Sequence, residues 1–281
     1  MSLEGCRTKA GTRKPGEAAF RLDTENAQVT FTTGTDAYAR HVGRYGATLS
    51  GAHADAAVLE PGDSALDVGC GPGGLLGELA RRLGVDRVAG IDPSEPFVEA
   101  ARAALPGVDI RLGAGEQLPF DDDAFDVVLS QLVINFLNDP DAGVREMRRV
   151  ARRAVTSCVW DYAGEMTMLR AFWDAALEVD PDAPDEGRTM RHCSPAELVA
   201  LWVRAGLSAV ETRALVVEAD YANFDDYWLP FEAGIAPSGA YCASLDADAR
   251  AVLRDRCFRR LGSPVGAFTL TARAWFVAGA I

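Results

Sequence analysis

The sequence lacks the features that mark several large classes of protein. Three histidines and six scattered cysteines, with no C-x-x-C pair, argue against both a zinc site and a disulfide framework. No apolar run approaches the length of a membrane span, and the N-terminus carries no signal-peptide core. We therefore expect no metal, no membrane association and a reducing, cytoplasmic location.

Basic residues are also scarce. The 281 residues include 28 Lys and Arg against 41 Asp and Glu, which gives a net charge of −13. Only Lys9 and Lys14 are lysines, a bias typical of GC-rich bacterial coding. Nucleic acids and anionic membranes bind basic surfaces, so this charge argues against either as the main partner.

Apolar strand-like runs alternate with amphipathic helical runs through the middle of the chain. This alternation predicts an α/β, doubly wound, mostly parallel sheet covered by helices on both faces. The expected strands include 64–69, 87–92, 108–115, part of 124–137, and 154–162. Two later strand-like runs, 208–219 and 267–279, are expected to pair antiparallel at the sheet edge.

Composition divides the chain into four parts within one overall domain. Residues 1–24 are polar and predict a loose tail, and residues 25–60 predict an N-terminal helical flap, with a helix over 36–59. Residues 61–162 predict the cofactor-binding core. Residues 163–281 predict the end of the sheet with an inserted helical cap, including two helices within 220–265.

The segment "LDVGCGPGG", which begins at Leu66, places a glycine cluster between a strand and a helix. Such a cluster lets a ligand approach bare backbone beside the helix N-terminus. Gly69, Gly71 and Gly74 fit the G-x-G-x-x-G pattern of dinucleotide-binding enzymes, and Gly69, Gly71 and Gly73 fit G-x-G-x-G. The glycines alone do not decide between the two ligand classes.

Two acidic residues narrow the choice of ligand. Asp92 ends the second expected strand, 19 residues after Gly73, where a carboxylate accepts ribose hydroxyls in either class. Asp67 stands two residues before the first glycine, where it would repel a pyrophosphate. S-adenosylmethionine has ribose and adenine but no phosphate, and it carries a sulfonium and an α-ammonium. Asp67 therefore favours S-adenosylmethionine over NAD.

Three segments together resemble the class I S-adenosylmethionine-dependent methyltransferases, nearest to the ubiquinone/menaquinone-biosynthesis-like group. They are "LDVGCGPGG", "GIDPSEPFVEAAR" and "GAGEQLPFDDDAFDVVLSQLVINFL". The resemblance spans roughly 37–162. It implies a Rossmann-like, seven-stranded sheet with an antiparallel last strand, S-adenosylmethionine as cofactor and S-adenosylhomocysteine as product.

The resemblance also implies roles for individual residues. Asp67 would serve the methionine end, Asp92 the ribose, and the backbone of Gly115 and Glu116 the adenine, since Ala114 replaces the usual acid. Gln131 would line the methyl-donor pocket. The full set of implied cofactor-binding residues is Tyr38, Arg44, Asp67, Gly69, Gly71, Gly73, Asp92, Pro93, Ser94, Gly115, Glu116 and Gln131. Among them, Arg44 would pair with the cofactor's carboxylate.

The sequence identifies no firm catalytic base. His41, in the flap, and Asp161, at the end of the fifth strand, are weak candidates, and Asp161 would otherwise cap the following turn. No "NPPY"-like motif follows the fourth strand, so a small-molecule acceptor is favoured, at oxygen, carbon or nitrogen. Two alternatives stay open: an S-adenosylmethionine-binding protein without methyl transfer and, more remotely, an NAD-linked oxidoreductase. The oligomeric state is not predicted.

Overall fold

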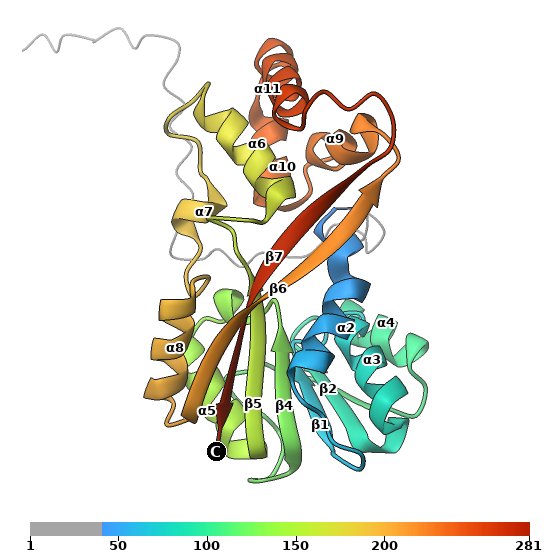
Figure 1. The fold of residues 1–281 in the computed structure, drawn as a ribbon. Coiled ribbons are helices and arrows are strands. Elements are labelled where there is room, and N and C mark those ends of the chain that lie inside the picture. The colour runs from blue at the N-terminus through green and yellow to red at the C-terminus, as the bar shows by residue number, and fades with distance from the viewer. Residues whose placement is uncertain (1–40) are drawn as a thin grey trace, which may run out of the picture. The chain divides into compact units, whose positions relative to one another are not determined.

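Seven strands form one sheet in the computed structural model, which describes residues 41–281 (Figure 1). The strand order is β3-β2-β1-β4-β5-β7-β6. The first five strands are parallel, β7 is antiparallel to β5, and β6 is antiparallel to β7. The predicted doubly wound sheet with an antiparallel edge is thus confirmed. The strands are β1 (Ala65–Val68), β2 (Val88–Asp92), β3 (Asp109–Leu112), β4 (Phe125–Gln131), β5 (Ala151–Trp160), β6 (Ser208–Tyr221) and β7 (Phe268–Ala280).

Helices cover the two faces of the sheet. On one face, α2 (Gly46–Ala56), α3 (Gly74–Leu83) and α4 (Glu95–Ala104) bury apolar side chains against β1, β2 and β4. On the other face, α5 (Pro140–Val150) and α8 (Pro195–Arg204) do the same. Single turns of 3₁₀ helix lie at η1 (Val42–Tyr45), η2 (Val85–Arg87) and η3 (Ile134–Phe136). The parallel strands therefore have apolar cover on both sides, and β1 and β2 are buried throughout.

A second group of helices forms the cap above the carboxyl end of the sheet (Figure 1). It contains α6 (Thr167–Leu177), α7 (Glu186–Thr189), α9 (Phe224–Glu232), α10 (Ala236–Ser244) and α11 (Ala247–Arg260). Three helices lie between β6 and β7, where the sequence predicts two, so that prediction is wrong. Gly234, at φ +75°, follows the end of α9, and Pro237 lies in the first turn of α10.

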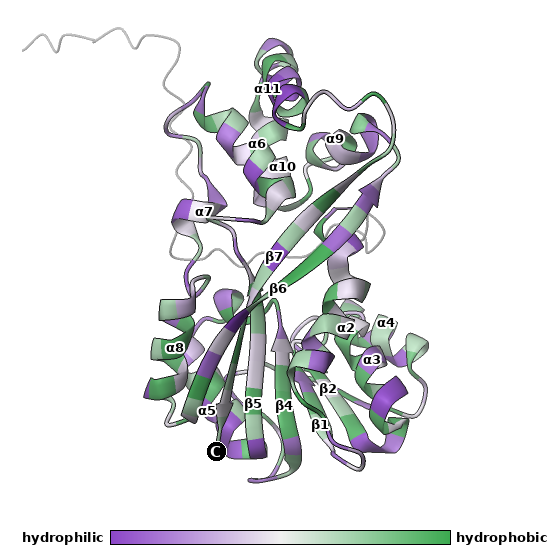
Figure 2. Ribbon diagram, viewed as in Figure 1, coloured by the Kyte–Doolittle hydropathy of each residue, from purple (hydrophilic) through white to green (hydrophobic). Residues whose placement is uncertain are grey.

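The antiparallel strands β6 and β7 extend beyond the rest of the sheet and reach the cap (Figure 1). β7 pairs with β5 over Ala274–Ala280; from Phe268 to Arg273 its strand partner is β6, and an isolated bridge joins Ala272 to Met166 on the other side. In Figure 2, hydrophobic residues follow β4 and β5, whereas hydrophilic residues recur along α11. The hairpin therefore connects the apolar sheet to a cap with a polar outer helix.

The predicted helix over 36–59 can be compared with the structure from residue 41 onward. There it consists of η1 followed by an α-helix from Gly46 to Ala56, which ends before the predicted end at Leu59. The predicted tail and residues 25–40 of the predicted flap, with Tyr38 among them, lie outside the described residues. Within residues 41–281, no helix combines the length and the apolar character needed to cross a bilayer.

Candidate cofactor-binding site

The glycine segment forms a tight turn between β1 and α3. The amides of Gly69 and Cys70 both donate to the carbonyl oxygen of Ile91 on β2, at 2.8 and 3.0 Å. Gly69, Gly71 and Gly73 all have positive φ, at +75°, +53° and +99°. This left-handed backbone is open to glycine at little cost. The turn is therefore fixed against the neighbouring strand before any ligand arrives.

Gly69 and Gly71 are glycines for different reasons. A Cβ at Gly69 would lie 2.4 Å from Cγ2 of Val133, so packing excludes a side chain there. A Cβ at Gly71 would meet nothing within 4 Å. The backbone of Gly71 is therefore bordered by open space, as close approach of a ligand requires.

Asp67 is a buried acid that no side chain in residues 41–281 neutralises. Its side chain is 1% exposed, and neither carboxylate oxygen accepts a hydrogen bond of normal geometry from these residues; the backbone of Leu76 in α3 makes a weaker contact that partly offsets the burial. Burial raises the pKa of Asp67 to about 8, and the charge of Asp92 raises it further. An uncompensated acid in this position disfavours a phosphate and favours a cation.

Gln131 adds a third acceptor atom to this region. Asp67 is in register with Leu129 on the adjacent strand β4, two residues before Gln131. The amide nitrogen of Gln131 donates to Ser50 Oγ at 3.0 Å, whereas its Oε1 is buried without a hydrogen bond of normal geometry in the described chain and has only a weaker contact with His53. Buried acceptors left unsatisfied cost roughly 1–3 kcal/mol each. The α-ammonium of S-adenosylmethionine offers three donors and a positive charge, so these oxygens fit that group.

Asp92 connects two loops at the edge of the site. Its Oδ2 accepts the amide of Gly71 at 2.9 Å, and its Oδ1 accepts the amide of Ser94 at 2.8 Å. The residue is 7% exposed, and burial raises its pKa. Because a carboxylate has about four acceptor positions, two remain for ribose hydroxyls. Pro93 is exposed beside it, and Ser94 precedes the first residue of α4.

The segment expected to hold the adenine lies after β3. A Cβ at Gly115 would lie 3.1 Å from Val68 and 3.3 Å from Leu137, so the loop packs closely there. The side chain of Glu116 accepts the amides of Asn138 and Asp139, at 2.9 and 3.4 Å. Glu116 therefore fixes the start of α5, and only its backbone remains a candidate for the ligand.

Arg44 has a different partner from the one expected. Its guanidinium forms an ion pair with Asp226 of α9 at 3.0 Å and donates to the carbonyl oxygen of Asp220 at 2.9 Å. It also lies 4.0 Å from the centroid of the Tyr221 ring. In this structure Arg44 links the N-terminal element to the cap, and its pairing with the cofactor's carboxylate stays a prediction.

The two weak catalytic candidates are both buried. Asp161 accepts hydrogen bonds from the guanidinium of Arg273, at 2.6 Å, and from the amide of Glu165, at 2.8 Å. It therefore caps the turn after β5, one of its two predicted roles. His41 is 2% exposed, and burial and then Arg44 lower its pKa to about 3. His41 is therefore neutral and a weak proton acceptor.

A buried polar group beneath α2 escaped the sequence analysis. His53 is fully buried, with Nε2 at 3.1 Å from Thr156 Oγ1 and Nδ1 at 3.5 Å from Cys158 Sγ. Ser50 lies three residues earlier on the same helix and binds Gln131. The i, i+3 spacing of Ser50 and His53 was the available signal.

Glu186 also escaped notice, because the sequence around it, "DPDAPDEG", is typical of a solvated loop. In the structure Glu186 is 4% exposed and accepts the indole hydrogen of Trp173 at 2.9 Å. Burial raises its pKa to about 7. The cap therefore contains a carboxyl group that titrates near neutral pH.

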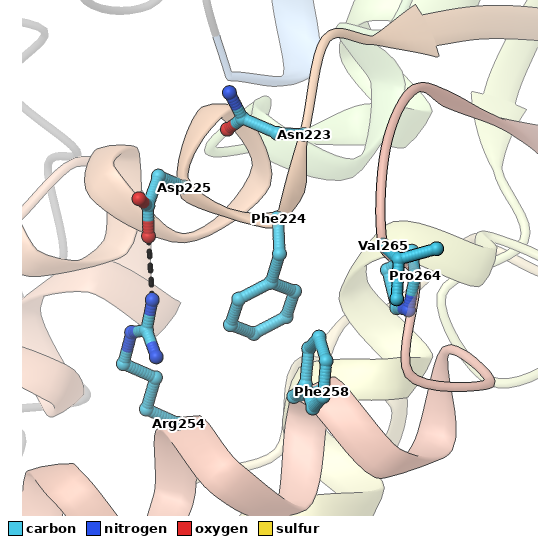
Figure 3. Close-up of a pocket in the computed structure, with 7 residues that line it drawn as sticks. All are labelled: Asn223, Phe224, Asp225, Arg254, Phe258, Pro264 and Val265. Atoms are coloured by element: carbon cyan, nitrogen blue, oxygen red, sulfur yellow. Dashed lines mark hydrogen bonds and ion pairs between the residues drawn. The ribbon is translucent and has the colours of Figure 1, made fainter.

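A surface pocket of about 260 Å³ lies elsewhere, on the cap (Figure 3). Phe224, Phe258, Pro264 and Val265 line it together with Asn223 and the ion pair between Asp225 and Arg254. It contains none of the residues described above, so it is separate from the candidate cofactor site.

Comparison with known proteins identifies the core that carries this site. Residues 66–156, from β1 into β5, match a family model described as a methyltransferase domain. An uncharacterised 37.1 kDa protein in a Streptomyces fradiae transposon is 34% identical over 172 residues, which cover 60% of this chain and 46% of that protein. The chain thus spans about half the length of the first curated relatives that it matches.

Two further proteins extend the comparison. The solved structure of the YcgJ protein from Bacillus subtilis has a TM-score of 0.54 at 20% identity and covers 82% of this chain and 97% of that one; at this identity the likeness is one of fold. A demethylmenaquinone methyltransferase of Roseiflexus castenholzii is 32% identical over 170 residues, which are 53% of this chain and 69% of that enzyme. With more than two thirds of that relative covered at this identity, the chain belongs to the class I S-adenosylmethionine-dependent methyltransferases.

Proposed function

We propose that this protein transfers a methyl group from S-adenosylmethionine to a small organic molecule, at an oxygen, carbon or nitrogen atom. The observation that carries the proposal is Asp67, a buried carboxyl group with no cationic partner in residues 41–281, directly before the glycine turn. Burial disfavours the ionised form of this carboxyl group, and a cationic ligand there would stabilise that form. NAD would bring a pyrophosphate to the same position.

Each residue of the site has a distinct task in this proposal. Asp67 and Gln131 bind the α-ammonium, Asp92 accepts the ribose hydroxyls, and Gly71 admits the ligand to the backbone. The cofactor supplies the activated methyl group. The chain aligns the acceptor and excludes water from the reaction.

The acceptor is proposed to enter between the sheet edge and the cap. The cap contributes a large buried cluster of aromatic and methionine side chains, of the kind that lines apolar small-molecule sites. A net charge of −13 disfavours a nucleic acid in this role. The activity named for the Roseiflexus relative, on demethylmenaquinone, is in line with a small-molecule acceptor.

Calorimetry on protein stripped of copurified ligand tests the cofactor assignment. We expect micromolar binding of S-adenosylmethionine and S-adenosylhomocysteine, and no binding of NAD. Asp67→Asn is the matched variant, because it keeps the shape of the side chain and removes its charge. Binding of NAD alone would contradict the proposal.

Methyl transfer itself is tested with S-adenosylmethionine labelled in its methyl group and a panel of phenols, enols and amines. Label in any acceptor, lost in Asp67→Asn, supports the proposal. Tight cofactor binding without turnover on any acceptor supports the alternative, a binding protein without methyl transfer.

A further inference from the structure

Among the buried polar atoms without a partner in residues 41–281, three belong to ring side chains that pack around Phe231 and Tyr45. They are Nε2 of His41 and the indole nitrogens of Trp160 and Trp228. The three side chains are 2%, 1% and 1% exposed. Leaving a buried polar atom unsatisfied costs more than a hydrogen bond contributes on balance, so three in one region call for a reason.

The three residues belong to one aromatic assembly. The ring of His41 lies edge-on to Phe231, with centroids 4.8 Å apart, and the ring of Trp228 lies 6.0 Å from Phe231. Trp160 contacts Tyr45 edge-on at 5.8 Å. Trp160, Trp228, Tyr45 and Phe231 are all members of the same buried hydrophobic cluster. We call this set of five residues the aromatic chamber.

The aromatic chamber adjoins the methionine end of the candidate cofactor site. Trp160 is the last residue of β5, at the same edge of the sheet as Gln131, the last residue of β4. Leu132, directly after Gln131, packs against the same hydrophobic cluster and has a strained φ of +61°. Tyr45 directly precedes α2, whose Ser50 holds the amide of Gln131.

The fold satisfies indole nitrogens elsewhere. Trp173 donates to Glu186 at 2.9 Å, and Trp202 donates to the carbonyl oxygen of Val155 at 3.1 Å. Both are as deeply buried as Trp160 and Trp228. Other buried polar atoms lack a partner too, such as Ser238 Oγ and Arg256 Nε, but among the buried indole nitrogens of the described residues this is true of Trp160 and Trp228 alone.

Chemistry then limits what a ligand of this chamber must offer. An indole N–H only donates, so each of the two tryptophans requires an acceptor atom. The aromatic walls favour a ring-sized apolar body. The neighbouring charges, Arg44 and Asp226, already form an ion pair, and His41 is neutral, which favours an uncharged ligand.

We propose that the aromatic chamber binds the methyl acceptor, and that the acceptor is a neutral ring compound with two oxygen atoms that accept hydrogen bonds from Trp160 and Trp228. This inference rests on the proposed function in one respect: the methyl transfer that follows binding. His41 Nε2 completes the polar contacts of the chamber.

The indole signals of the five tryptophans test the proposal in ¹⁵N-tryptophan-labelled protein. Each signal is assigned by a Trp→Phe variant. The probe is 2′-hydroxyacetophenone, which has a hydroxyl beside a carbonyl, added with saturating S-adenosylhomocysteine. We expect downfield shifts of the Trp160 and Trp228 indole hydrogens and none for Trp202. Ethylbenzene, which lacks both oxygens, should leave the Trp160 and Trp228 indole hydrogens without a downfield shift.

Binding of the probe to variants adds an independent readout. Trp160→Phe and Trp228→Phe keep an aromatic ring and remove the donor, so each should weaken 2′-hydroxyacetophenone about tenfold without weakening S-adenosylhomocysteine. Trp202→Phe is the matched control and should leave the affinity for the probe unchanged.

The outcomes separate this proposal from the proposed function. Binding of S-adenosylhomocysteine without any shift at Trp160 or Trp228 overturns the chamber and leaves the cofactor assignment intact. Shifts by the probe in a protein that does not bind S-adenosylhomocysteine support the chamber and count against the methyltransferase proposal. Benzyltrimethylammonium is a cationic ring compound without oxygen. If it displaces 2′-hydroxyacetophenone at a concentration below that of the probe, the proposal that the acceptor is neutral and carries oxygen atoms is overturned.

Discussion

Gln131 donates an amide hydrogen to Ser50 Oγ at 3.0 Å, and this one bond determines which atom of Gln131 faces the cofactor region as an acceptor. Without Ser50, the amide of Gln131 would keep only its weaker contact with His53. Because Ser50 lies on α2, the helix that follows the N-terminal element contributes to the cofactor site although it carries none of the glycine motif. His53, three residues later, attaches the same helix to β5.

Ser50→Ala tests this relationship. We expect the affinity for S-adenosylmethionine to fall about fivefold, the equivalent of about 1 kcal/mol for one hydrogen bond. Calorimetry measures the change, and Thr48→Ala, at an exposed position of α2, is the control. Equal affinity for the parent and Ser50→Ala would show that the amide of Gln131 needs no support.

Asp67→Asn should stabilise the ligand-free protein at high pH and weaken cofactor binding. The folded protein holds the Asp67 proton up to a pKa of about 8, whereas the unfolded chain releases it near the ordinary value of 3.8. The free energy of unfolding therefore falls as the pH rises from about 4 to about 8. In Asp67→Asn this part of the pH dependence is absent. Its melting temperature should therefore fall less across that pH range than the melting temperature of the parent.

The same variant should bind S-adenosylmethionine at least tenfold more weakly, since it loses a charge-assisted contact worth roughly 1.5–3 kcal/mol. Binding to the parent at pH 7 should also release a proton from Asp67, which calorimetry in buffers of different ionisation enthalpy detects. Absence of proton release would count against an ionised Asp67 in the complex.

Gly69→Ala and Gly71→Ala should separate stability from binding. Alanine at either position costs roughly 1–2 kcal/mol of backbone strain. Only Gly69→Ala adds a clash, with Val133 at 2.4 Å, so it should be the less stable variant in denaturant titrations. Gly71→Ala should fold and yet lose cofactor affinity, because its Cβ enters the open space beside the turn. Full affinity in a folded Gly71→Ala variant would contradict the assigned position of the ligand.

Asp92→Ala should cost roughly 1.5–3 kcal/mol of cofactor affinity, the scale for hydrogen bonds to a charged group. The loss combines the ribose contacts with release of the Gly71 amide from Oδ2. Asp109→Ala, an exposed carboxylate on the neighbouring strand β3, is the control for net charge. Affinity unchanged by Asp92→Ala would refute the ribose assignment.

Glu186→Gln should flatten the pH dependence of stability at mildly acidic pH. Burial raises the pKa of Glu186 from 4.5 to about 7, so the folded state holds a proton that the unfolded state has released. Stability from this group is therefore lost as the pH rises from about 4.5 to about 7. Glutamine keeps an acceptor for Trp173, and Glu218→Gln, at an exposed position, should leave the profile unchanged.

The sequence predicted the features that depend on local pattern. Alternating apolar runs predicted the parallel strands, and the glycine turn with Asp67 and Asp92 predicted a nucleoside site, because each signal lies within a few residues of the chain. The partner of Arg44 could not be predicted from local pattern. Its partner Asp226 lies 182 positions away, so only the folded chain brings the two charges together.

The hydrogen-bond partners of the tryptophan indoles could not be predicted from the sequence either. In the sequence, Trp160, Trp173, Trp202 and Trp228 are equivalent apolar residues, and spacing cannot tell which indole finds a partner. The answer depends on tertiary neighbours, as with Glu186, whose loop composition predicted solvation and whose position beside Trp173 is buried.

The continuous pairing of β6 with β7 has a mechanical consequence. The two strands run from the sheet into the cap without an intervening linker. Helices α9 and α11 are therefore attached to the end of a rigid two-stranded ribbon. A movement of the cap would have to twist the whole ribbon and strain many ladder hydrogen bonds at once. We therefore expect the acceptor to enter beside η1 (Val42–Tyr45), which the partly exposed ion pair of Arg44 and Asp226 attaches to the cap, and we expect salt to weaken this ion pair.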